Sequence, residues 1–293
     1  MEVKKPCSFE DQLQKLINRN CLVEDKEKAL SVLQNINYYR LTAYFLPFKS
    51  TDKKYKDGTT FESVYRIYEF DRKLSNFIFA YIEEIELMLR IQLSNYHSLK
   101  YGALGYTDPN NFNKKHNKSR FDENIQTAIA NNKKQFFVKH HIQKYDSQFP
   151  LWVIIELFST GELSFFFADM LRCDKKYLAK NLFNTTDNIA SNWLLCFTHL
   201  RNYCAHYSRL YYNKFSTIPA TPKNYCYTLK DRVFDYLLVL KFLYPEANKW
   251  NTNFMIGLEN LINEYSDVIS LYHLGFPSNW KELLQKHHKN SDI

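Results

Sequence analysis

The stretch RNYCAHYSR, Arg201 to Arg209, combines side chains that could transfer a proton and stabilise a phosphate. His206 follows Arg201 by five positions, and Asn202 lies directly beside the arginine. Histidine titrates near neutral pH and can act as a general acid or base. Arginine is permanently charged and binds phosphate oxygens through two parallel N–H groups. The combination suits cleavage of RNA, because the 2′-hydroxyl of the strand is itself the nucleophile and the reaction requires neither a metal nor another cofactor.

Each of the three residues has a natural role in that reaction. His206 would remove the proton of the 2′-hydroxyl or protonate the departing 5′-oxygen. Arg201 would stabilise the negative charge that develops around the phosphorus, and Asn202 would orient His206 or hydrogen-bond a phosphate oxygen. The expected products carry a 2′,3′-cyclic phosphate and a 5′-hydroxyl.

A helix over residues 187–212 is expected to carry these side chains. Five positions on an ideal helix are about 140° apart, so Arg201 and His206 would not share a face, whereas Asn202 and His206 would. Either the long arginine side chain wraps around the helix, or two copies of the motif meet across the two-fold axis of a homodimer. The ordinary alternative is that Arg201 pairs with a carboxylate and His206 ends a packed helix.

The same segment also offers a possible zinc ligand set. Cys196, His199, Cys204 and His206 have the spacing C-x2-H-x4-C-x-H. Compact zinc sites of this length wrap the ion with loops and glycines, whereas this segment is apolar and has a helical pattern. Buried structural cysteines are therefore the better interpretation, and we expect no metal here.

The charge balance favours a polyanionic partner. Lys and Arg number 39 against 31 Asp and Glu, which gives a net charge of +8. A basic excess of this size is compatible with RNA binding, although many proteins carry it for solubility alone.

The sequence also indicates the cellular compartment of the protein and whether it contacts a membrane. The six cysteines contain no C-x-x-C pair, which suggests reduced thiols in a cytoplasmic protein. The amino terminus lacks the apolar core of a signal peptide, and the longest apolar runs are too short to span a bilayer. We therefore expect a cytoplasmic protein without a membrane partner.

The elements that position the motif are predicted to be helices throughout. Glycine is scarce, at 6 residues, and strand-like alternation is absent, so the predicted fold class is all-α. The strongest signal runs from Phe61 to Lys100 without proline or glycine, with Thr59 and Glu62 at capping-box spacing and Gly102 as its stop. It predicts one very long helix or two nearly collinear ones. Its buried stripe is predicted to contain Leu74, Phe77, Ile78, Tyr81, Ile82, Ile85, Met88 and Leu89.

Shorter helices are expected on both sides of this long one. They lie before Pro47, near 121–143, across 151–171 with a break at Ser159–Gly161, and at 225–245, 252–270 and 277–288. The predicted organisation is an amino-terminal helical region (1–55), a helical bundle with the motif (56–215) and a carboxy-terminal helical extension (216–293).

Further side chains could support the motif or contact RNA. Glu86 and Arg90 are one helical turn apart and would hold Arg201, contact RNA or form an ordinary ion pair. Arg209 is expected to contact a phosphate.

Two other groups of residues could contact RNA through aromatic rings or positive charges. Tyr39 and Arg40, next to Tyr38, could stack on single-stranded RNA, although core packing of the tyrosines is the more common arrangement. The loop with Lys114, Lys115, Lys118 and Arg120 either binds phosphates or is simply solvated.

Four stretches, in this order, resemble the Abi-like abortive-infection family, and specifically its AbiD/AbiF group. They are NYYRLTAYFLPF at 37–48, YEFDRKLSNFIFAYIEEIELMLR at 68–90, PLWVIIELFSTGELS at 150–164 and the motif segment RNYCAHYSRLYYN. The resemblance spans about 35–215 of the sequence.

That resemblance implies a ribonuclease of the HEPN superfamily. It implies a HEPN-type helical bundle, a dimer that joins two motifs, metal-independent RNA cleavage by Arg201 and His206, and a role in phage defence. A structured non-coding RNA encoded nearby is an implied partner. Many family members have a second histidine where this sequence has Tyr207, which puts a role for that histidine in doubt here. The alternative function is a non-catalytic protein that holds a structured RNA.

Overall fold

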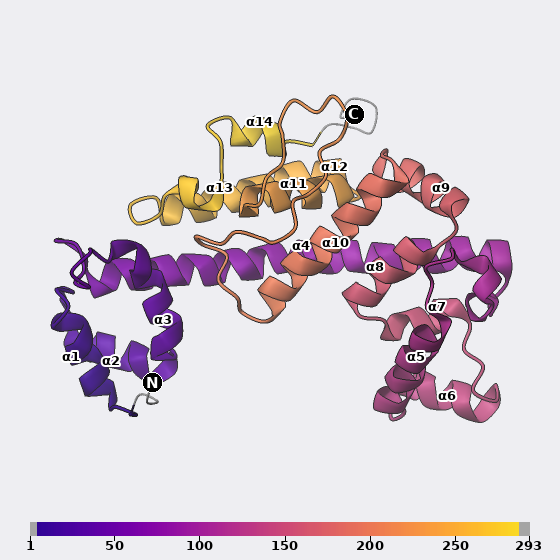
Figure 1. The fold of residues 1–293 in the computed structure, drawn as a ribbon, viewed down its shortest axis with the longest axis horizontal. Helices are drawn as coiled ribbons and strands as arrows, with labels where there is room; N and C mark the ends of the chain where they lie inside the picture. The colour runs from indigo at the N-terminus through magenta and orange to yellow at the C-terminus, as the bar shows by residue number, and fades with distance from the viewer. Residues whose placement is uncertain (1–4, 287–293) are drawn as a thin grey trace. The chain divides into compact units, whose positions relative to one another are not determined.

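The computed structural model describes residues 5–286, and every regular element in that range is a helix (Figure 1). Three isolated β-bridges join single residue pairs, but no strand or sheet forms among the described residues. The predicted all-α fold class is therefore confirmed. No helix in the described range is long and apolar enough to cross a membrane. The chain divides into two compact units.

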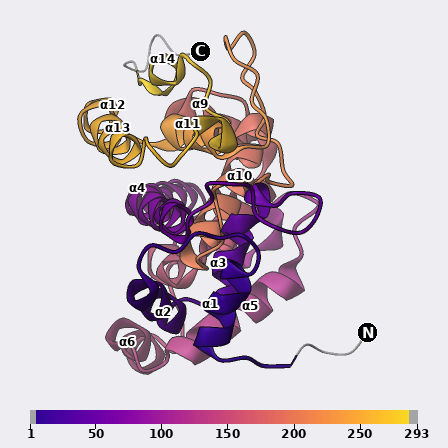
Figure 2. The same cartoon turned by 90° about the vertical axis from the view of Figure 1, so that its left-hand side faces the viewer.

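The first unit comprises the described residues up to Ser75 and residues 257–271. It contains α1 (Phe9–Ile17), α2 (Lys26–Asn35), α3 (Tyr38–Phe45), η1 (Leu46–Phe48), the start of α4 (Phe61–Tyr101) and most of α13 (Met255–Glu264). α1 packs against α2 (Figure 2), and the Tyr44 hydroxyl donates to the Asp71 carboxylate at 2.6 Å, which ties α3 to α4. The short helices predicted before Pro47 are confirmed.

The second unit comprises residues 76–256 and the described residues from Tyr272. It contains the rest of α4 and α5 (Lys118–Asn132), α6 (Phe136–Lys144), α7 (Leu151–Ile154), α8 (Thr160–Asp169), α9 (Arg172–Phe183), α10 (Asp187–Ala205), α11 (Val233–Leu243), α12 (Ala247–Lys249) and α14 (Trp280–Leu284). Its short turns are η2 (Gly105–Thr107), η3 (Pro109–Asn111), η4 (Ile155–Leu157), the π-helical η5 (Trp250–Phe254) and the end of η6 (Leu271–Leu274). The predicted boundaries between the three regions of the chain, at residues 55 and 215, stay a prediction.

α4 is one uninterrupted helix of 41 residues, so the first of the two predicted alternatives, one long helix rather than two collinear ones, is confirmed. Most of the predicted stripe is buried, and only Phe77 and Met88 are half-buried. The helix ends at Gly102, whose φ is +86°. Glycine adopts this left-handed conformation without steric cost, so the predicted stop is confirmed.

The predicted capping box at the start of α4 is wrong. The Thr59 hydroxyl donates to a backbone carbonyl in the preceding loop. The Glu62 carboxylate accepts from the backbone N–H groups of residues 24 and 25 at 3.1 and 3.3 Å. Thr60 caps the helix instead, because its hydroxyl oxygen accepts from the N–H of Ser63 at 3.0 Å. Glu62 thus makes a tertiary contact with residues 24 and 25 and does not form the capping box that the local sequence pattern predicts.

Several shorter helices differ from the prediction. The stretch near 121–143 forms α5 and α6, separated where the amide side chains of Asn132 and Gln135 hydrogen-bond locally, which competes with helix formation. α11 begins only at Val233, because the Asp235 carboxylate accepts from the N–H of Arg232 and caps the helix there. The helices predicted at 252–270 and 277–288 are shorter, and the last two residues of the latter lie outside the described range.

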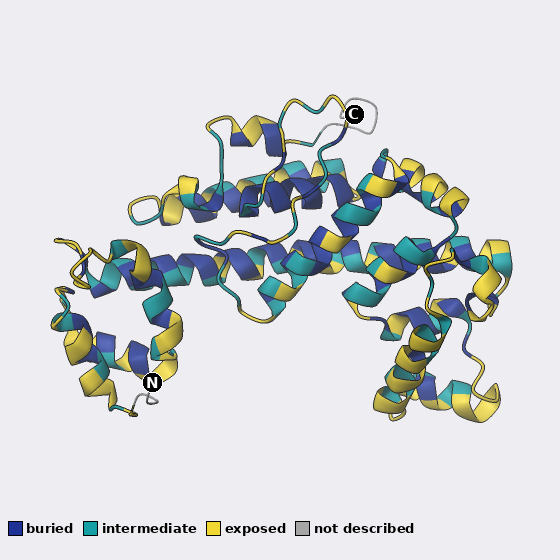
Figure 3. Cartoon of the chain, viewed as in Figure 1, coloured by how far each residue is buried: buried dark blue, intermediate teal, exposed yellow. Residues whose placement is uncertain are grey.

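α10 packs against α8, α9 and α11 in the second unit. All 11 residues of α11 are buried, and Figure 3 shows this helix dark blue along its length. The ring of Trp193 on α10 stacks on Phe242 of α11 with centroids 4.6 Å apart. Buried aromatic pairs contribute both area and specific geometry, so α10 is fixed in place by this contact.

His97 lies on α4 in the core of the second unit and is completely buried. Its ring packs against Tyr101, Phe112 and Phe166, with centroids 4.8, 5.4 and 5.3 Å away. Burial lowers the pKa of His97 to about 4, because an imidazolium loses its hydration in such surroundings. The folded protein therefore keeps this ring neutral.

We expect His97 to weaken the folded state in mild acid. The unfolded chain protonates this histidine below about pH 6.5, whereas the folded chain resists protonation until its pKa of about 4. Protonation thus favours unfolding progressively as the pH falls through that window, by up to about 3 kcal/mol. Urea unfolding at about pH 7 and about pH 4.5 measures the loss. It should be smaller in His97→Phe, and an equal loss in the two proteins would contradict the assignment.

Candidate active site

The Arg201–His206 segment forms the carboxy-terminal end of α10. The helix begins after Thr186, whose side chain accepts from the N–H of Ile189, and it ends at Ala205. The predicted continuation to residue 212 is wrong. Tyr207 has a φ of +56°, a left-handed conformation that ends a helix.

His206 is the C-cap of α10 and its side chain is exposed. Its backbone N–H donates to the Asn202 carbonyl at 2.9 Å, so the two residues lie one turn apart, as predicted. The Asn202 side chain is exposed as well. An exposed imidazole can reach a bound substrate and exchange protons with solvent.

Arg201 is held by a carboxylate from another helix. Its Nε lies 3.8 Å from Oε2 of Glu86 on α4. Its Cζ lies 5.9 Å from the centroid of the Phe79 ring, within reach of a cation–π contact. One terminal nitrogen donates to Oδ1 of Asn202 at 3.5 Å. The side chain remains 30% exposed, so a substrate can approach the guanidinium.

Glu86 is itself anchored on two further sides. Its Oε1 accepts from Nη2 of Arg90 at 2.6 Å, and its Oε2 accepts from the hydroxyl of Thr160 at 2.5 Å. Thr160 begins α8 and is 2% exposed. The carboxylate therefore connects α4, α8 and α10, and the position of Arg201 depends on all three helices.

Of the roles expected for Arg90, its contacts agree with holding the Glu86 carboxylate that faces Arg201. The side chain is only 10% exposed. Nη1 donates to the carbonyl of Ile155 and Nη2 to Glu86. Both terminal nitrogens are thus engaged within the protein, and they fix the carboxylate that faces Arg201. Contact of Arg90 with RNA stays a prediction.

The other predicted RNA-binding residues lie in three places. Arg209 is half-buried just beyond α10, with its Cζ 5.7 Å from the ring centroid of Tyr212. Lys114 and Lys115 are exposed in the loop before α5. Tyr39 and Arg40 are exposed on α3, in the first unit rather than the second. Core packing is wrong for Tyr39, whose residue is 86% exposed.

The cysteines near the motif are structural. Cys196 and Cys204 are buried, and burial raises the pKa of the Cys196 thiol to about 12. His199 is half-buried, and burial lowers its pKa. Within residues 5–286, no group of three or more His, Cys, Asp or Glu side chains is placed to hold a metal ion.

Thr160 and Phe79 were not singled out from the sequence. Neither residue has a local spacing relation to Arg201, because the contacts join helices that are distant in sequence. Both residues fall in stretches that resemble the Abi-like family, Phe79 in the block at 68–90 and Thr160 in the block at 150–164, which is the available sequence signal.

Comparison with known proteins decides the family. The family model described as Abi-like protein matches residues 31–212, which is more than half of the chain and contains Glu86, Thr160, Arg201 and His206. This chain belongs to the Abi-like protein family. No curated protein matches it, and no solved structure matches it. Membership of the Abi-like family points to abortive infection, a form of phage defence.

We expect removal of the Glu86 carboxylate to destabilise this Abi-like protein. Glu86→Ala leaves Arg90, which is only 10% exposed, without its counter-charge, and breaking a buried ion pair in this way costs about 3 kcal/mol. The free energy of unfolding in urea measures the loss. Asp122→Ala is the matched control, because it breaks the exposed i,i+4 pair with Lys118 on α5 and should cost much less. Equal losses in the two variants would contradict the anchoring role of Glu86.

Proposed function

We propose that this Abi-like protein is a phage-defence ribonuclease of the HEPN superfamily. It cleaves single-stranded RNA without a metal, at a site that Arg201 and His206 of two subunits form together. One observation carries the proposal: an exposed imidazole ends α10 in the same final turns in which a carboxylate network fixes a guanidinium. The exposed imidazole can reach a bound phosphodiester, and the anchored guanidinium remains accessible enough to bind it.

The proposed reaction is an in-line transfer at phosphorus. An imidazole takes the proton of the 2′-hydroxyl, and the 2′-oxygen forms a bond to the phosphorus while the bond to the 5′-oxygen breaks. A second proton donor protonates the departing 5′-oxygen. Arg201 stabilises the charge on the phosphate oxygens through the terminal N–H groups of its side chain, which is 30% exposed. The products are a 2′,3′-cyclic phosphate and a 5′-hydroxyl.

The need for both a base and an acid supports a dimeric site. The motif of one chain supplies one histidine, His206, and the next residue is Tyr207. Two motifs related by a two-fold axis would supply two imidazoles, one for each proton transfer, and two guanidiniums for the phosphate. The AbiD/AbiF-type assembly expected from the sequence has this composition.

We expect the purified protein to cleave single-stranded RNA in the presence of EDTA and to leave 2′,3′-cyclic ends. Arg201→Ala and His206→Ala should each lower the rate by at least about 100-fold, since each removes transition-state stabilisation or proton transfer. End-labelled RNA resolved on a gel, with chemical analysis of the ends, measures this. His140→Ala, which changes a histidine of α6 outside the motif, should retain the wild-type rate. Identical RNA patterns from wild type and His206→Ala would refute catalysis.

A mixture of Arg201→Ala and His206→Ala proteins tests the composite site. Mixed dimers would keep one arginine and one histidine in the shared cleft, whereas a dimer of either variant lacks one of these side chains entirely. With water in place of the missing second imidazole, the mixture should be less active than wild type but more active than either variant alone. Light scattering establishes whether dimers form and exchange. Activity no higher than the sum of the two inactive proteins, with exchange demonstrated, would refute sharing of the site between subunits.

A non-catalytic RNA-binding function is the second candidate, and the net charge of +8 favours it. It predicts binding of a structured RNA that weakens steeply with salt, because phosphate contacts release counterions. Binding that falls in Arg201→Ala while no cleavage occurs would select this candidate.

A further inference from the structure

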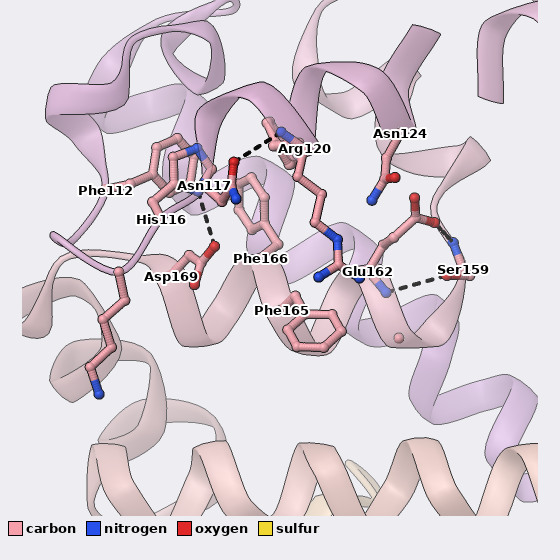
Figure 4. Close-up of a pocket in the computed structure, with 13 residues that line it drawn as sticks. Phe112, His116, Asn117, Arg120, Asn124, Ser159, Glu162, Phe165, Phe166 and Asp169 are labelled. Atoms are coloured by element: carbon pink, nitrogen blue, oxygen red, sulfur yellow. Dashed lines mark hydrogen bonds and ion pairs between the residues drawn. The ribbon is translucent and has the colours of Figure 1, made fainter. Parts of the chain in front are cut away.

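A cavity of about 530 Å³ opens in the second unit beside the starts of α5 and α8 (Figure 4). Small-molecule sites are typically about 300–1,000 Å³ in volume. Its lining residues all come from two segments, 112–124 and 159–169. The cavity is therefore built by other residues than the Arg201–His206 motif on α10.

Two cations of the cavity have no counter-charge. Lys115 and Arg120 are exposed, and no ion pair involves either of them within residues 5–286. Lys118, which lies between them in sequence but does not line the cavity, is paired with Asp122. Figure 4 shows the Arg120 side chain directed into the cavity toward Phe165 and Glu162. Two unpaired cations favour an anionic group such as a phosphate.

An exposed aromatic ring lies beside these cations. Phe165 lines the cavity and is 61% exposed, whereas Phe112 and Phe166, which also line it, are buried. The exposed ring of Phe165 is accessible to a planar ligand that stacks on it. A ring next to a phosphate-binding cation is the arrangement on which nucleic-acid bases stack.

The two carboxylates of the cavity are already oriented. Oδ2 of Asp169 lies 3.0 Å from Nδ1 of His116. Oε2 of Glu162 accepts from the N–H of Ser159 at 2.6 Å, in the capping box that starts α8 at the break predicted from the sequence. Each carboxylate has a second oxygen that these bonds do not use. Carboxylates only accept hydrogen bonds, so they favour bases whose exocyclic amino group offers two N–H donors over uracil, which offers a single ring N–H.

We propose that this cavity is a nucleotide-binding site, distinct from the Arg201–His206 site. It takes one nucleotide whose base carries an exocyclic amino group. The phosphate lies against Lys115 and Arg120, the base stacks on Phe165, and one of the two carboxylates, that of Glu162 or that of Asp169, accepts from the amino group. The nucleotide is either free or an unpaired residue of an RNA strand. The binding does not require that the Arg201–His206 site be catalytic.

Calorimetric titration of the full-length protein with adenosine monophosphate, uridine monophosphate and ribose 5-phosphate tests the free nucleotide. Adenosine monophosphate should bind more tightly than the other two. Phe165→Ala and Arg120→Gln should each weaken it about tenfold, because each removes a stacking or phosphate contact. Phe136→Ala, which changes an 87% exposed phenylalanine elsewhere in this unit, and Lys118→Gln are the matched controls and should leave binding unchanged. Equal binding of ribose 5-phosphate would overturn the role of the base.

A single-stranded oligoadenylate tests the alternative source of the nucleotide. The RNA is bound to the His206→Ala protein, so that cleavage cannot affect the measurement. If adenosine monophosphate does not bind, the same two substitutions should weaken oligoadenylate binding while the two controls do not, which assigns the cavity to a strand residue. If neither ligand responds to Phe165→Ala and Arg120→Gln more than to the controls, the proposal is overturned. Loss of cleavage alone, with nucleotide binding retained, would instead refute only the proposed catalytic function.

Discussion

The carboxylate of Glu86 is the constraint on which the candidate active site depends. It accepts hydrogen bonds from Arg90 and Thr160 and lies 3.8 Å from Nε of Arg201. A carboxylate that is only 17% exposed is stable there because cationic and hydroxyl donors surround it. The same contacts hold the Nε side of the Arg201 guanidinium, while one terminal nitrogen donates to Asn202 and the side chain stays 30% exposed to another partner. The interaction that stabilises three helices thus also orients the charge that the proposed chemistry requires.

The end of α10 divides the motif into a fixed part and an accessible part. Arg201 lies inside the helix, which packs against α8, α9 and α11. His206 lies at the cap, where Tyr207 turns the chain away in a left-handed conformation. A helical continuation would have placed the next residues on the packed surface. Because the helix stops there, the imidazole is exposed while its backbone N–H is still bonded to the last turn.

The sequence allows those features to be predicted that depend on local patterns. α4 follows from its apolar stripe without Gly or Pro, and the start of α8 follows from Ser159. The end of α10 could not be predicted, because residues 203–212 contain no glycine or proline and continue an aromatic pattern. The Glu86–Thr160 and His116–Asp169 contacts join residues 74 and 53 positions apart, and no periodicity encodes such a pairing. The cavity could not be predicted from the sequence for the same reason, because two segments that are separated in the sequence, 112–124 and 159–169, form its walls.

α11 has a consequence for where the functional part of an Abi-like chain ends. The family match stops at residue 212, yet α11, at Val233–Leu243, is wholly buried and packs against α10. The matched segment therefore does not close its own hydrophobic surface. A protein shortened to that segment would present the ring of Trp193 to water, and exposed aromatic patches promote aggregation. Any family member without a counterpart of α11 must cover this surface with another element or with a second protein chain.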